Sequence, residues 1–167
     1  MQKITYFTLL LLLGASMLYS GCRRSVDDDP TSADGALYAA LKNQTFTYYK
    51  GEDKILQPKG SSPHGPFKLL FNAKAASVLD SLGKLPVGAT FPDSSIVLKE
   101  VFDGNDKKQL VPMMRMRNDA NSAEGWLWGQ YTPEGKLVYS VSKKGAKCVS
   151  CHQATGNRDL TLSFGLH

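Results

Sequence analysis

The sequence predicts an α+β domain that is rich in β-structure, with a curled antiparallel sheet and a few short helices. Apolar and aromatic residues recur in short runs. Turn-forming tetrapeptides at 103–106 (Asp-Gly-Asn-Asp) and 132–135 (Thr-Pro-Glu-Gly) connect neighbouring runs, as in antiparallel hairpins. Four long helices cannot be found between residues 45 and 141, which excludes a helical bundle.

Six segments have the alternating or nearly continuous apolar pattern of β-strands. In the fifth of them, the period of two places Trp126 and Trp128 on one face, where we expect them to pack in the core. The expected strands are 45–49, 67–71, 96–102, 109–116, 125–131 and 137–141.

Two helices are expected before the third strand. The first spans 36–42 and is capped by Ser32 or Asp34. The second spans 73–82, with Asn72 as its N-cap and Gly83 ending it. Its expected buried stripe consists of Ala75, Val78, Leu79 and Leu82.

The N-terminal segment has the order of a signal peptide. Lys3 is followed by the apolar residues 4–18, which are too few to span a bilayer comfortably. Residues 18–22, Leu-Tyr-Ser-Gly-Cys, resemble a bacterial lipoprotein processing box, in which the cysteine becomes the lipidated first residue. We therefore predict a lipoprotein signal peptide at 1–21 and a lipid anchor on Cys22. The alternative is an unmodified thiol in an ordinary secreted protein.

The mature chain is expected to begin with a flexible tether at 22–35, which is polar and carries the acidic run 27–29. The remaining residues, 36–167, suffice for one domain with a sizeable core and not for two. The formal net charge of the full chain is +5, and its basic residues are scattered. We expect no nucleic-acid partner, and at most an attraction to anionic partners or membranes.

Cys148-Val149-Ser150-Cys151-His152 is a Cys-x-x-Cys-His motif, the sequence to which haem is attached in c-type cytochromes. On one helical turn, Cys148 and Cys151 share a face and can meet two vinyl groups along one edge of the porphyrin. His152 then turns its imidazole toward the iron. We predict one covalent haem c (iron) on a C-terminal helix, with the sheet curled around it.

A Cys-x-x-Cys pair also occurs in redox disulfides, zinc sites and inert structural pairs. A closed zinc site needs two more Cys or His ligands, and the chain offers only Cys22, His64 and His167. A thioredoxin-like motif lies early in a βαβ unit, whereas this one lies near the C-terminus without such a unit. These features favour haem attachment, with a redox or structural disulfide as the alternative.

The position of the motif narrows the class of cytochrome. Small electron-carrying cytochromes c have the motif near the N-terminus and a methionine far downstream as the sixth ligand, and here no Met follows His152. Met113, Met114 and Met116 precede the motif, and core packing explains them better than ligation of iron. These observations therefore favour a β-rich cytochrome domain that carries its haem motif near the C-terminus.

Several segments, taken in their order along the sequence, resemble those of a known family. The most specific is the string Phe-Pro-x-x-x-Ile-Val-x-Lys-Glu at 91–100, ahead of the haem motif. The others are Ser-Pro-His-Gly at 62–65 before 67–72, Gly-Trp-Leu-Trp at 125–128, 145–153, and Asp-Leu-Thr-Leu at 159–162. Over roughly 46–164 the chain resembles cytochrome P-460 and its relative cytochrome c′-beta.

The resemblance implies a five-coordinate haem with His152 on the proximal side. In the cytochrome P-460 branch, a lysine matched by Lys99 is joined covalently to the porphyrin, and the haem oxidises hydroxylamine. In the c′-beta branch, the cross-link is absent and a phenylalanine-lined distal pocket admits nitric oxide. Burial in an apolar strand would give Lys99 the neutral amine that such a bond requires. The alternative is an amine that reaches water at the sheet edge or pairs with a carboxylate.

Phe67 and Phe91 are the candidates for the distal wall, because they lie at the starts of the strands matched to the family's pocket. Ordinary core packing would give the same sequence pattern. His64 lies in a Pro/Gly-rich turn and is expected to be a turn residue or to lie near the distal rim.

The sequence therefore predicts a haem protein of the cell envelope, either periplasmic or an outer-membrane lipoprotein. Its expected partners are a small nitrogen-containing ligand or substrate, a periplasmic redox partner and the membrane. An oxidoreductase and a gas-binding protein are both compatible with these residues. A periplasmic electron-transfer cytochrome c is the third hypothesis, weakened by the missing sixth ligand.

Overall fold

The protein is described by a computed structural model that covers residues 29, 31–59, 62–154, 156 and 158–165. Within this part of the chain, seven strands form one antiparallel sheet in the order β1-β2-β3-β4-β6-β7, and β5 pairs with β4. This confirms the α+β, β-rich fold. The strands are β1 (Phe46–Tyr48), β2 (Phe67–Asn72), β3 (Ile96–Asp103), β4 (Asp106–Arg115), β5 (Trp126–Trp128), β6 (Gln130–Tyr131) and β7 (Leu137–Tyr139).

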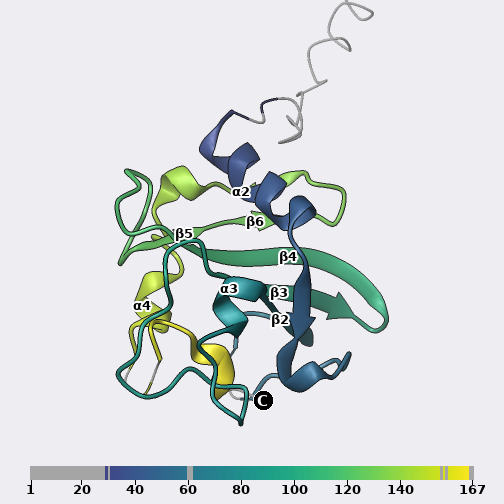
Figure 1. Ribbon diagram of the computed structural model, residues 1–167. Coiled ribbons are helices and arrows are strands. Elements are labelled where there is room, and N and C mark those ends of the chain that lie inside the picture. Colours follow the sequence, from purple (N-terminus) through teal and green to yellow (C-terminus); the bar gives the residue numbers. More distant parts are fainter. Residues whose placement is uncertain (1–28, 30, 60–61, 155, 157, 166–167) are drawn as a thin grey trace, which may run out of the picture.

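Short helices surround the sheet (Figure 1). Figure 1 shows α2 near the β6 end of the sheet, α3 in front of β3, and α4 on one side of the molecule. The helices are α2 (Ala33–Asn43), α3 (Ala73–Ala76), α4 (Val149–His152) and the 3₁₀ turns η2 (Tyr49–Gly51), η3 (Val141–Lys143) and η4 (Leu162–Phe164).

The β3–β4 hairpin is the centre of the sheet. Asp103 pairs with Asp106 at its tip, as the turn at 103–106 predicts. Lys99 lies in the middle of β3, between Leu69 of β2 and Val111 of β4. Side chains alternate across a strand, so these three paired residues point to the same face of the sheet.

The expected strand at 125–131 is divided into β5 and β6 at Gly129. A Cβ at Gly129 would lie 2.8 Å from Cδ2 of Leu37, so α2 packs too closely there for a larger residue. The last expected strand, 137–141, ends at Tyr139, and Val141 begins η3 instead.

The helix expected at 73–82 is wrong in its length, because α3 ends at Ala76. Asn72 does cap it, accepting the N–H of Ala75 at 2.9 Å. Beyond it, the Asp80 carboxylate accepts the N–H groups of Leu82 and Lys84, both at 2.9 Å, and closes a loop. A side chain that bonds to nearby backbone competes with the helix, and Leu82 is consequently 63% exposed rather than buried.

The first helix is confirmed with a different start. Ser32 caps α2 by accepting the N–H of Gly35 at 3.0 Å, and α2 begins at Ala33, so the end of the expected tether is helical. Asp34 is not the cap. Its carboxylate accepts the N–H of Val141 at 2.8 Å and ties η3 to α2.

Two apolar cores lie on the two faces of the sheet. The smaller one packs α2 against β5 and β6 through Leu37, Leu127 and Tyr131. The larger one lies on the face that carries Val97 and Met113. Its buried members are Tyr49, Phe67, Leu69, Phe71, Ala75, Leu85, Phe91, Val97, Met113, Trp126, Trp128 and Phe164. The face with the larger core also carries the site described below.

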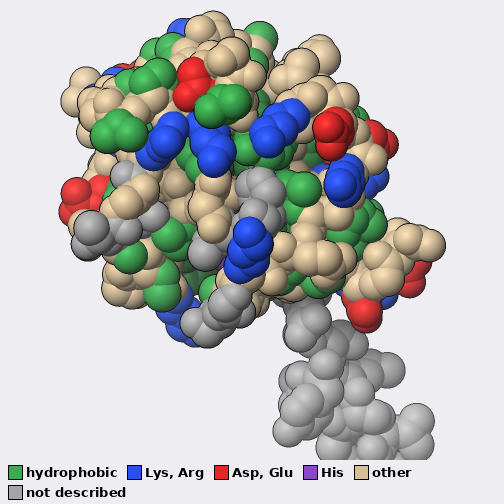
Figure 2. Space-filling view, turned by 90° about the horizontal axis from the view of Figure 1, so that it is seen from below, with side chains coloured by type: hydrophobic (Ala, Val, Ile, Leu, Met, Phe, Trp, Pro, Cys, Tyr) green, Lys and Arg blue, Asp and Glu red, His purple; other side chains and the backbone are tan. Residues whose placement is uncertain are grey.

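On the surface seen in Figure 2, Lys and Arg side chains lie across the middle of the face and acidic ones lie toward its edges. Leu82 and Val87 are the most exposed large apolar side chains in the described part of the chain. Among the described residues, no helix has the length and apolar character needed to cross a membrane. The predicted signal peptide, residues 1–21, and Cys22 lie outside the described residues.

Candidate haem-binding site

The Cys-x-x-Cys-His motif forms a helical turn, as predicted. Cys148 is the N-cap of α4, and its carbonyl accepts the N–H of His152 at 3.1 Å. Both cysteines are free thiols: Cys148 is half-buried and Cys151 is exposed, whereas His152 is buried. Burial raises the pKa of the Cys148 thiol, and Cys151 adds to this effect. One short turn thus presents two thiols and one imidazole.

These side chains open onto a cavity of about 360 Å³, a size typical of small-molecule sites. The strands β3 and β4 form one wall of it, the segment that contains α4 and η4 forms another, and the turn at 62–64 contributes the rim. Its lining includes Ser62, Pro63, His64, Val97, Lys99, Gln109, Val111, Pro112, Met113, Trp128, Tyr139, Lys147, Cys148, Cys151, His152 and Leu162. The lining is mainly apolar, with a few polar groups that converge.

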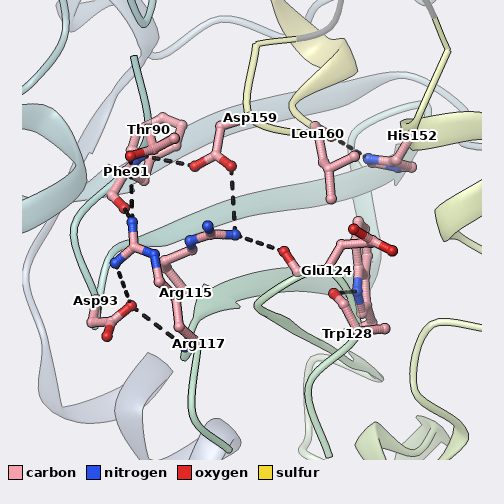
Figure 3. Close-up of polar contacts among 11 residues, drawn as sticks. Thr90, Phe91, Asp93, Arg115, Arg117, Glu124, Trp128, His152, Asp159 and Leu160 are labelled. Carbon is pink, nitrogen blue, oxygen red and sulfur yellow. Dashed lines mark hydrogen bonds and ion pairs between the residues drawn. The ribbon is translucent and has the colours of Figure 1, made fainter. Parts of the chain in front are cut away.

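The His152 ring has a defined orientation. Its Nδ1 lies 2.7 Å from the carbonyl oxygen of Leu160 (Figure 3). A carbonyl can only accept, so Nδ1 carries the proton and the lone pair is on Nε2. Burial lowers the pKa of His152, the bond to Leu160 opposes this, and the charge on Lys99 lowers it further. A neutral imidazole is the form that binds a metal.

Trp128 supports the imidazole from the side. Its ring meets that of His152 edge-on, with centroids 4.8 Å apart, and its Nε1 donates to the carbonyl of Ala123 at 3.2 Å. Gly145, just before the motif, has a φ of +61°, and a Cβ there would lie 2.6 Å from Cδ1 of Trp128. A side chain here would clash with the Trp128 ring, and the left-handed φ disfavours other residues, so both features explain a glycine at this position.

Lys99 lies at the same cavity, 7% exposed in a central strand. Its Nζ lies 4.5 Å from the centre of the Phe67 ring, and burial lowers its pKa to about 8. Within the described residues Lys99 forms no ion pair, and the neighbouring Glu100 pairs with Lys107 instead. In the described part of the chain the amine thus has no carboxylate partner, and its strand lies in the middle of the sheet rather than at an edge. Its cross-link to haem stays a prediction.

Neither phenylalanine predicted for the distal wall lines the cavity. Phe67 is fully buried beneath the Lys99 amine. Phe91 is fully buried too, and its ring meets Trp126 edge-on with centroids 5.7 Å apart. The turn from Pro92 to Ser95 separates Phe91 from β3 and directs it into the core. Both residues are packed as core aromatics in this structure, and their part in a distal wall stays a prediction.

The structure brings His64 and Met113 to the cavity instead. His64 does lie in a turn, where its N–H donates to the Ser62 hydroxyl at 3.3 Å, and it also lines the cavity. Burial lowers the pKa of His64 to about 4, with contributions from Lys99 and His152. Met113 lines the cavity, whereas Met114 packs on the opposite core. The alternation of β4 could have separated these two methionines from sequence alone.

The residues at this cavity fit a haem. An apolar slot suits the porphyrin, two thiols lie on one turn for its vinyl groups, and the His152 imidazole has its Nδ1 proton already engaged. In the described part of the chain, no group of three or more His, Cys, Asp or Glu side chains is placed to hold a metal ion directly.

A β-rich domain whose C-terminal turn presents two thiols and an oriented imidazole to an apolar cavity belongs to the class of haem-binding domains. A sequence model of one family, Cytochrome P460, matches residues 47–163. The chain belongs to the cytochrome P460 family, as its resemblance indicated, and this makes it a haem protein. A search of curated proteins found no match to the chain.

Proposed function

We propose that the protein is an exported c-type haem protein that binds or oxidises small nitrogen species at an iron held by His152. The observation that carries this proposal is that Cys148, Cys151, His152 and Lys99 all line one largely apolar cavity. Cys148 and Cys151 would form the thioether bonds, and Nε2 of His152 would bind the iron. The haem supplies the redox-active iron at which a small ligand binds.

The remaining lining residues select the ligand. Apolar walls formed by Val97, Val111 and Pro112 disfavour anions and admit small neutral molecules such as hydroxylamine or nitric oxide. Oxidation of hydroxylamine releases protons, so an oxidase needs an acceptor at the cavity. His64 has a pKa of about 4, so its imidazole is neutral near pH 7. So low a pKa makes the imidazole a weak base, so His64 can accept a hydrogen bond from the ligand at a ring nitrogen but takes up a proton poorly.

Electron transfer is the second candidate function, and one observation favours it. Met113 lines the cavity, and its thioether is the kind of group that fills the sixth position of electron-carrying cytochromes c. A six-coordinate iron would leave no position for a nitrogen ligand. The coordination number of the iron therefore separates the two functions.

We expect a five-coordinate, high-spin iron that binds nitric oxide, and Met113→Leu should leave the absorption spectrum unchanged. The substitution is close to isosteric, so the cavity wall is retained. Met114→Leu, on the opposite core, is the matched control. Absorption and electron paramagnetic resonance spectra with and without nitric oxide measure the outcome. A low-spin iron that turns high-spin in Met113→Leu, and not in Met114→Leu, would establish electron transfer instead.

We further propose that the protein is anchored in the cell envelope by lipid on Cys22, where it would meet a periplasmic redox partner. The signal-like segment at 1–21 and the processing box before Cys22 support this. Cys22→Ser should move the protein from the membrane to the soluble fraction without loss of haem, because anchoring and haem attachment use different cysteines. Detection by haem stain in both fractions measures this. Wild-type protein that is already soluble would contradict the anchor.

A further inference from the structure

The carbonyl that accepts from His152 belongs to a strained turn. In residues 158–161 the N–H of Thr161 donates to the carbonyl of Arg158 at 2.9 Å. The two central residues, Asp159 and Leu160, have φ values of +47° and +62°. Positive φ at both positions is typical of a type I′ turn, which favours Asn-Gly, and a leucine rarely adopts it. Aspartate suits the first of these positions but leucine does not suit the second, so contacts from elsewhere in the fold must help to hold the turn.

The Asp159 carboxylate holds the turn through two buried contacts (Figure 3). One oxygen accepts the N–H of Phe91 at 2.8 Å. The other lies 3.4 Å from Nη1 of Arg115, and the two side chains are 7% and 9% exposed. Water screens such a pair weakly, and removal of one charge would leave the other buried without a partner.

Arg115 is fixed in turn by the loop before β5. Its Nη1 donates to the carbonyl of Glu124 at 2.7 Å, and its guanidinium carbon lies 5.3 Å from the centre of the Trp126 ring. A Cβ at Gly125 would lie 2.7 Å from the same Nη1, so the backbone packs closely against the guanidinium. The arginine is thereby a rigid support for Asp159.

We propose that the Arg115–Asp159 ion pair is a positioning device for the proximal histidine. The pair holds the 158–161 turn in its strained form, and the turn keeps the Leu160 carbonyl at 2.7 Å from Nδ1 of His152. A carbonyl partner at Nδ1 fixes the ring and makes Nε2 a stronger donor to a metal. The pair thus favours the ferric over the ferrous state and keeps the reduction potential low. This inference rests on the proposed role of His152 as the axial ligand.

The test is Asp159→Asn in the haem-loaded protein. Asparagine has nearly the same shape, adopts positive φ readily and can still accept from Phe91, but it lacks the charge that binds Arg115. We expect an upward shift of the haem reduction potential and a lower iron–histidine stretching frequency in the resonance Raman spectrum of the ferrous protein. Haem content should stay unchanged.

The matched control removes a second ion pair from the same region. Nη1 of Arg117 lies 2.8 Å from Oδ1 of Asp93, and both side chains are more than a third exposed. Figure 3 draws this pair below the one formed by Arg115 and Asp159. Asp93→Asn should shift the potential and the stretching frequency much less than Asp159→Asn does, because this pair touches the turn at 158–161 only through Phe91, whose carbonyl accepts from Arg117 and whose N–H donates to Asp159. An equal shift in both variants would show a general charge effect and would overturn the inference.

Arg115→Lys is the second variant, and it tests the positioning role independently if the Asp159→Asn protein does not fold. Lysine keeps the charge but loses the planar group that meets Glu124 and Asp159 together. We expect a smaller shift in the same direction. An unchanged potential and stretching frequency in the folded variants would overturn the positioning role. A wild-type protein without an iron–histidine band would instead overturn His152 as the ligand, which is a failure of the proposed function.

Discussion

Replacement of both Cys148 and Cys151 by alanine is expected to abolish covalent haem attachment. The two thiols lie on one turn beside the cavity, and thioether bonds require both sulfur atoms. Protein produced with the haem-attachment machinery should show a haem-stained band on a denaturing gel for wild type and none for the double variant. Each single variant should retain at most one thioether, visible as a changed absorption maximum.

Ser150→Ala is the control for this experiment, because Ser150 lies between the cysteines on the same turn and its side chain is exposed. It should keep the haem-stained band at wild-type intensity. A wild-type protein that carries no covalent haem under these conditions would contradict attachment at the motif. It would leave the family assignment in place, because that assignment rests on residues 47–163 as a whole.

The central hairpin could be predicted because its signals are local. The apolar run of β3 and the Asp-Gly-Asn-Asp turn lie within a few residues of each other, and the structure pairs Asp103 with Asp106 as expected. The length of α3 could not be predicted in the same way. The apolar spacing from Ala75 to Leu82 fits a helix, but the Asp80 carboxylate binds the backbone of Leu82 and Lys84 instead. A helix through Leu82 and a loop closed by Asp80 are both compatible with the local sequence, and the structure contains the loop.

Some residues of the candidate site could likewise be predicted from local signals, and others could not. Lys99 could be identified because a lysine in an apolar strand needs a partner or a function. The haem motif at 148–152 could be identified from its residue types and spacing alone. Phe91 could not be placed, since an aromatic next to a turn looks the same in a core as in a pocket wall. The ion pair between Arg115 and Asp159 joins residues far apart in the sequence, and no local pattern indicates it.

Lys99 is expected to decide between oxidation and simple binding of the nitrogen ligand. A bond from Nζ to a porphyrin carbon replaces one N–H and one C–H bond with a C–N bond. It releases two protons and two electrons, so it requires an oxidant such as peroxide. The nucleophile is the neutral amine, and a pKa of about 8 makes the neutral form common at mildly alkaline pH. Cross-linking should therefore become faster as the pH rises through about 8.

In the oxidase case, Lys99→Leu should abolish hydroxylamine oxidation while covalent haem is retained. Lys99→Arg should do the same, because the guanidinium keeps its proton and cannot act as the nucleophile. Mass spectrometry of a wild-type digest should find the Lys99 peptide joined to the haem peptide that contains 148–152. Lys107→Leu, an exposed lysine on the neighbouring strand, is the matched control and should keep both the cross-link and the activity.

In the binding case the two peptides separate in the wild-type digest, and Lys99→Leu leaves the haem spectrum unchanged. The same variant should then alter nitric oxide association, because it exchanges a polar amine at the cavity for an apolar side chain. Oxidation and simple binding differ in the covalent bond between Lys99 and haem, not in the charge at position 99. Lys99→Arg is informative because it keeps the charge but cannot form the bond. A wild-type protein without the cross-link that still oxidises hydroxylamine would contradict Lys99 as the source of the activity.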